Sequence, residues 1–105
     1  MKFYRVTTNG TGIYEAVDRD CPKDSNLRKN KPDGSWLPKK GSQFPGAISY
    51  WTEYGWNKYQ DSGLFKWQES VTSGETEVEI LDQKPSDILY EDEYQLIIPT
   101  PSSDR

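Results

Sequence analysis

The end of the sequence places the strongest constraint on the fold. Residues Tyr94–Ile98 join an aromatic side chain to leucine and two isoleucines, a composition typical of β-strands. Pro99 and Pro101 end this segment, since proline cannot donate a hydrogen bond to a sheet. The short apolar run Ile88–Tyr90 precedes it, and the acidic corner Glu91–Glu93 separates the two. The sequence therefore predicts two strands that flank an acidic turn.

Three earlier segments also favour strands. Lys2–Thr7 and Ala47–Thr52 are rich in aromatic and β-branched residues, which suit a sheet. In Thr76–Leu81 two glutamates alternate with valine and isoleucine, the pattern of a half-buried strand. Between the first strand and the next element, Thr8–Gly12 supplies Asn and two glycines for a turn.

Helices are expected at two places. Ile13–Val17 is compatible with a short strand or a helical stretch, and we favour a short helix. After a turn predicted at Glu53–Gly55, apolar and polar residues follow helical spacing, although Gly63 interrupts them, so one helix and two shorter helices are both plausible. The residues that define this face are Trp56, Tyr59, Gln60, Leu64 and Trp67.

The segment Asp18–Gly46 is expected to be a long irregular loop, because it contains four prolines and three glycines. Trp36–Pro38 is its strongest apolar anchor. Together these patterns predict an α+β fold: a small single domain over residues 1–98, mostly antiparallel β-sheet with one or two short helices. Residues 99–105 are expected to form a flexible tail.

The composition excludes several classes of protein. A chain of 105 residues has room for one core. It contains no histidine, which removes Ser-His and Cys-His nucleophile pairs and zinc sites that need imidazole. Cys21 is the single cysteine, so no internal disulfide can form. No apolar run approaches the length of a membrane span. We expect a cytoplasmic protein with no membrane partner and no metal site.

The net charge of −4 is unevenly distributed. Arg19–Lys40 holds seven basic and three acidic residues, whereas Glu69–Gln95 holds nine acidic residues and one lysine. The basic stretch could contact phosphates, but the acidic total argues against a partner of duplex nucleic acid. Two solvated surfaces would explain the same asymmetry.

Two features carry candidate chemistry. The three acidic residues of Glu91–Glu93 could poise one carboxyl for proton transfer or attract a hard cation, or could simply form an exposed turn. Arg5 is expected on the face of its strand opposite Tyr4 and Val6. If that face points inward, its guanidinium needs a carboxylate or an anionic ligand as a partner.

These segments, in this order, resemble the ADP-ribosyltransferase-like fold. The resemblance rests on Tyr4-Arg5 in the first strand, Ser49-Tyr50-Trp51-Thr52 before the predicted helix, and Glu91–Glu93 before the last strand. It implies a nucleotide ligand, with NAD as the natural candidate and no other cofactor required.

The resemblance also implies roles for individual residues. Arg5 would bind the phosphate or ribose of NAD. Ser49 would brace the site, and Thr52, at the end of the same strand, would be a further ligand-binding residue. Tyr54 or Trp56 would stack on the nicotinamide. Glu93, with Glu91 beside it, would stabilise the oxocarbenium-like transition state.

Two questions stay open at this stage. Gln95 could occupy the position of the catalytic carboxylate in place of Glu93, and such a protein would bind a nucleotide without reacting it, so the sequence leaves open whether the protein is an enzyme. The alternative is a non-enzymatic protein-interaction module, for example a small phage or prophage protein that binds a host factor through an aromatic and acidic surface. The sequence does not indicate an oligomeric state.

Overall fold

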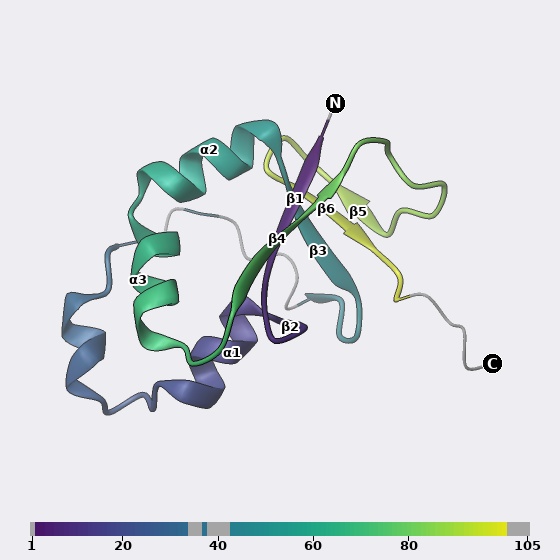
Figure 1. The fold of residues 1–105 in the computed structure, drawn as a ribbon. Helices are drawn as coiled ribbons and strands as arrows, with labels where there is room; N and C mark the ends of the chain where they lie inside the picture. The colour runs from purple at the N-terminus through teal and green to yellow at the C-terminus, as the bar shows by residue number, and fades with distance from the viewer. Residues whose placement is uncertain (1, 34–36, 38–42, 101–105) are drawn as a thin grey trace.

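The computed structural model describes residues 2–33, 37 and 43–100. It confirms the predicted α+β class: an antiparallel six-stranded sheet is accompanied by three α-helices, where one or two were expected (Figure 1). Within the described residues, no helix is long and apolar enough to cross a membrane.

The sheet runs in the order β4-β1-β3-β6-β5, and the short β2 shares one side of β1 with β3. Every pairing is antiparallel. The strands are β1 Phe3–Thr8, β2 Thr11–Gly12, β3 Ile48–Thr52, β4 Thr76–Leu81, β5 Tyr90–Glu91 and β6 Gln95–Ile98.

The α-helices gather at one side of the sheet in Figure 1. They are α1 Ile13–Asp20, α2 Glu53–Asp61 and α3 Leu64–Val71, and a 3₁₀ helix, η1, covers Asn26–Asn30. The helix favoured at Ile13–Val17 is thus confirmed. This helix extends to Asp20, into the segment Asp18–Gly46 that was expected to be irregular, and η1 lies within the same segment. Leu37, in the predicted anchor, is buried, whereas Trp36 and Pro38 lie outside the described residues.

The turn predicted at Glu53–Gly55 is wrong, because these residues form the first turn of α2. Thr52 causes this by acting as the N-cap: its Oγ1 accepts a hydrogen bond from the Gly55 N–H at 3.1 Å. Further along the chain, Gly63 adopts a left-handed φ of 81° and separates α2 from α3. Of the two helical alternatives, the pair of short helices is confirmed.

Apolar side chains pack on both faces of the sheet. The helix-covered face carries the larger cluster, in which Trp51 stacks on Tyr59 with ring centroids 5.0 Å apart. The opposite face carries a smaller cluster centred on Phe3, Tyr50 and Leu96. Aromatic rings therefore supply much of the core.

Strand β4 lies at an edge, and the prediction that it is half-buried is wrong. Val78 is 39% exposed and Ile80 is 50% exposed, although both share the face of β1 on which the helices pack. The reason is that α1 and α2 contact β1 and β3, so the helical layer covers the middle of the sheet. The alternation correctly put Val78 and Ile80 on one face of the sheet. At an edge strand, however, that face is not covered by the helices and stays exposed to solvent.

The predicted acidic turn does join two strands, β5 and β6, but the first was misplaced: Glu91 belongs to β5, whereas Ile88 and Leu89 lie outside it. Asp92 organises it: Oδ1 accepts hydrogen bonds at 2.8 Å from the N–H groups of Tyr94 and Gln95. Its other oxygen, Oδ2, accepts from the Tyr90 hydroxyl at 2.7 Å. The central carboxylate of the acidic corner thus satisfies backbone donors, as Asx-type turns do.

Candidate functional site

A cleft opens where β1 and β3 separate. The two strands pair only at Phe3–Thr52 and Tyr4–Trp51, after which β1 continues beside β2. The cleft has a volume of about 360 Å³, within the lower range for ligand sites. It is lined by Arg5, Val6, Gly12, Ile13, Tyr14, Glu15, Asp18, Ala47, Ile48, Ser49, Tyr50, Trp51 and Gln95.

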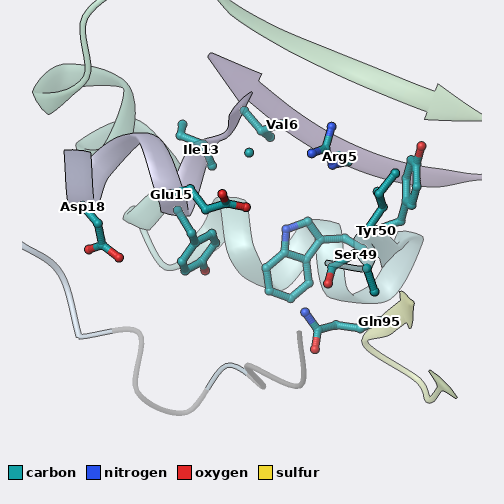
Figure 2. A pocket seen from close by; sticks show the side chains of 13 residues that line it. Arg5, Val6, Ile13, Glu15, Asp18, Ser49, Tyr50 and Gln95 are labelled. Atoms are coloured by element: carbon teal, nitrogen blue, oxygen red, sulfur yellow. The ribbon is translucent and has the colours of Figure 1, made fainter. Parts of the chain in front are cut away.

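Figure 2 shows how its labelled polar residues are divided. Asp18, from α1, stands at one end, Ser49 and Gln95 stand at the other, and the carboxylate of Glu15, also from α1, lies between them. Arg5, from β1, lies on the same side of the view as Tyr50. Arg5 therefore shares one side of the view with the neutral polar residues, and Asp18 lies on the opposite side.

One nitrogen of the Arg5 guanidinium forms an ion pair with Glu79. Its Nη1 donates to Glu79 Oε1 at 2.7 Å, in a partly exposed ion pair. Its Nη2 faces the start of α1, since a Cβ added at Gly12 would lie 3.6 Å from this nitrogen and 3.7 Å from Glu15 Oε1. A guanidinium has five donors in a fixed fork, so Arg5 keeps donors for a ligand while bound to Glu79.

Three aromatic residues supply the apolar walls. Tyr14, Tyr50 and Trp51 line the cleft, and Tyr14 also stacks on Tyr59 with centroids 6.2 Å apart. Burial raises the pKa of Tyr14 well above its ordinary value, and Gln68 opposes the rise. Burial, together with the negative charge of Glu79, also raises the pKa of Tyr50. Both hydroxyls are therefore neutral at neutral pH.

The neutral end of the cleft is built by two adjacent strands. Ser49 lies on β3, and Gln95, opposite Trp51, begins β6. Gln95 is buried, and two hydrogen bonds with Asp92 fix its main chain. The Gln95 N–H donates to Asp92 Oδ1 at 2.8 Å, and the Gln95 carbonyl accepts from the Asp92 N–H at 2.9 Å. The acidic turn thus positions a side chain of the cleft without contributing its own carboxylates to the lining.

The cleft holds two carboxylates that the sequence interpretation did not single out. Asp18 lies 3.5 Å from Arg28 Nη2, measured to its Oδ1. Glu15 lies in the first turn of α1, where a negative charge is favoured by the helix dipole. Their spacing of three residues places both on one face of a helix, a signal that exists in the sequence only once Ile13–Asp20 is recognised as helical.

The structure brings together two of the predicted site residues, Arg5 and Ser49. Glu91 and Glu93 are not among the described residues that line the cleft. Glu91 forms an ion pair with Lys84 at 2.7 Å. The backbone carbonyl of Glu93 accepts a hydrogen bond from Thr52 Oγ1 at 2.5 Å.

The three remaining predicted residues also lie outside the lining. Thr52 caps α2. Tyr54 is exposed and contacts the ring of Tyr94, with centroids 5.2 Å apart. Trp56 stacks on Tyr4 with an interplanar angle of 7°, on the helix-covered face of the sheet. Where the chain is described, no three His, Cys, Asp or Glu side chains gather into a group able to hold a metal ion.

Comparison with known proteins found no matching family model, no matching curated protein and no matching solved structure.

Proposed function

We propose that this protein binds a nucleotide, with NAD as the first candidate, in the cleft between β1 and β3, and does not cleave it. The observation that carries the proposal is the meeting of Arg5, Ser49 and Gln95, from three neighbouring strands, around a cavity with aromatic walls. The resemblance implied that Arg5 binds the phosphate or ribose and that Ser49 braces the site.

Each part of a nucleotide has a matching group in the cleft. A phosphate suits the donors that Arg5 keeps while its Nη1 is bound to Glu79. A base or nicotinamide ring suits the faces of Tyr14, Tyr50 and Trp51. Ribose hydroxyls suit Ser49 and Gln95.

The absence of cleavage follows from the residue at the neutral end. Loss of nicotinamide from NAD develops positive charge on the ribose, and a nearby carboxylate stabilises that charge. Gln95 lines this end of the cleft, and an amide carries no negative charge. The carboxylate of Glu15 lies between this end and Asp18. The volume of about 360 Å³ suits one half of a dinucleotide, so the second half would extend out of the cleft.

Thermal unfolding with NAD, ADP-ribose and nicotinamide tests the proposal. A ligand at tenfold its Kd stabilises the folded state by about 1.4 kcal/mol, which raises the Tm of a domain of this size by roughly 5 °C or more. Arg5→Gln should abolish the rise. Arg19→Gln, which removes an equal charge outside the cleft lining, should retain it.

Nicotinamide release, followed by chromatography, tests the second half of the proposal. We expect none from the unaltered chain. Release that is lost in Glu93→Gln or Glu91→Gln would instead assign the reaction to the acidic turn, and release lost in Glu15→Gln would assign it to α1. If none of the three ligands changes the Tm at millimolar concentration, the proposed function is wrong.

A further inference from the structure

The outer edge of β4 is open. Strand β4 pairs with β1 over all six of its residues in one unbroken register, from Phe3–Leu81 to Thr8–Thr76. Among the described residues it pairs with no other strand. Every second residue of β4 therefore turns its N–H and C=O groups away from β1, toward a position that a further strand could fill. Figure 1 shows β4 crossing in front of the other strands.

Of the usual protections against strand pairing, this edge has only charged side chains, at Glu77 and Glu79. Proteins commonly place lysine, proline or a β-bulge on an exposed edge. The segment Thr76–Leu81 contains no lysine and no proline, and its register with β1 has no bulge. Val78 and Ile80 are 39% and 50% exposed. They lie opposite Val6 and Tyr4, so they extend the apolar face of the sheet outward.

The remaining side chains of the edge give it one sign of charge. Glu75, Glu77, Glu79 and Asp82 are exposed, and residues 75–82 contain no basic residue. Arg5 pairs with Glu79. In the described part of the chain, no cation forms an ion pair with the other three. The edge thus alternates apolar and acidic groups, and the acidic groups are mostly unneutralised.

The charges argue against a second copy of this chain as the occupant. A two-fold axis normal to the sheet pairs residues of the same face, so Glu77 or Glu79 would face Glu77 or Glu79 of the other copy in the registers of greatest overlap. Directly opposed like charges destabilise a strand pair. A strand in which basic residues alternate with apolar ones would satisfy both the glutamates and the exposed Val78 and Ile80.

We propose that the β4 edge is a docking site for an extended segment of a partner protein in which basic and β-branched apolar residues alternate. Main-chain hydrogen bonds to β4 would give affinity, as in other cases of strand addition. The partner's apolar side chains would pack beside Val78 and Ile80, and its basic side chains would face Glu77 and Glu79. This site is distinct from the cleft, since no residue of β4 lines it.

A fluorescent eight-residue peptide of alternating valine and lysine is the probe, with the whole chain as the receptor. We expect binding by fluorescence polarisation, at least tenfold tighter than that of a peptide with four valines followed by four lysines. Alternate amides within residues 76–81 should exchange with solvent more slowly in the complex, because they acquire hydrogen-bond partners. Glu77→Lys should weaken binding about tenfold. Asp61→Lys, the same charge change at the end of α2, should not.

Three results would overturn the inference. Equal affinity for the two lysine peptides, or for alternating valine and glutamate, would mean that neither strand pattern nor charge matters. Unchanged amide exchange in β4 would mean that no strand is added. Sedimentation showing a dimer that Ile80→Lys converts to a monomer would make a second copy the occupant.

Discussion

Strands β4 and β6 lie late in the same chain and have opposite surroundings. Strand β6 is paired on both sides, with β3 and β5, and Gln95, Leu96 and Ile97 are buried. Strand β4 is paired only with β1 in the described structure, and four of its six residues are exposed. Both were predicted as strands from their own residues.

The difference comes from what lies beside each strand. The hairpin that contains β6 is fastened to the N-terminus of α2: Thr52 N–H donates to the Tyr94 carbonyl at 2.9 Å, and Thr52 Oγ1 donates to the Glu93 carbonyl. Strand β4 is fastened to β1 and otherwise faces outward. A strand's place in the sheet, rather than its pattern, therefore determines how much of its apolar surface leaves water.

The sharpest test of this contrast compares one truncation in each strand. Leu96 is fully buried, so Leu96→Ala should lower the free energy of unfolding by about 3 kcal/mol, through lost burial and the cavity left behind. Ile80 is 50% exposed, and Ile80→Ala should cost less than about 1 kcal/mol. Urea unfolding followed by tryptophan fluorescence measures both. Equal losses would break the comparison.

The second test adds an atom between α2 and the hairpin. A Cβ at Gly55 would overlap the Tyr94 carbonyl oxygen and lie 3.0 Å from Trp51 Cε3, so Gly55→Ala should lower stability by about 2 kcal/mol despite the better helix propensity of alanine. Gly12→Ala is the matched control, because a Cβ there meets only ordinary contacts. A stable Gly55→Ala variant would show that α2 can move away from the hairpin.

A smaller effect is expected from removal of the cap itself. Thr52→Ala deletes the oxygen that accepts from Gly55 N–H and the hydroxyl that donates to the Glu93 carbonyl. The loss should be about 1–2 kcal/mol. Thr76→Ala, at the start of β4, serves as the control and should change stability much less. Equal stability of Thr52→Ala and the unaltered chain would mean that the cap does not secure the hairpin.

The smallest effect on stability is expected from the hydrogen bonds between Asp20 and Ser73, which precedes β4. Asp20 accepts hydrogen bonds from the backbone and hydroxyl of Ser73, at 3.0 and 3.2 Å. Its hydrogen bond with Arg19, then those with Ser73, hold its pKa well below the ordinary 3.8. Because folding lowers the pKa of Asp20, its charge stabilises the folded state at pH values above the ordinary pKa of 3.8. This stabilisation is lost as the pH falls further below 3.8.

Asp20→Asn should therefore lower the Tm slightly at pH 7, and the difference from the unaltered chain should shrink below pH 3.8. Thermal unfolding by circular dichroism across pH 2–7 measures it. Asp24→Asn, which removes the charge of a nearby exposed carboxylate, provides the control. A difference that stays constant with pH would show that the charge of Asp20 does not contribute.

The sequence predicted helices and strands correctly where one local feature decides the structure. The alternation in Thr76–Leu81 gave the strand bounds that the structure has, and Gly63 marked the break between two helices. The helix start at Glu53 was missed, because Thr52 was assigned only to a strand, whereas it both ends β3 and caps α2. One residue with two roles is not evident from composition.

The candidate site was less accessible to prediction. Arg5 and Ser49 were selected from the sequence and line the cleft, whereas Glu15 and Asp18 were not selected. The three carboxylates of the acidic turn were the obvious chemical feature, yet Asp92 bonds the turn's own backbone and Glu91 bonds Lys84. The turn instead positions Gln95 at the cleft.

The sequence by itself determined the α+β class, most of the strands and the two-strand acidic turn with which it ends, because these depend on side-chain alternation and turn chemistry within a few residues. Only the tertiary structure decided that β4 is an exposed edge, that β1 and β3 separate to leave a cleft, and that Gln95 lines it. Those outcomes depend on which strands become neighbours, and pairing between residues as distant as Phe3 and Leu81 is set by the packing of the whole chain.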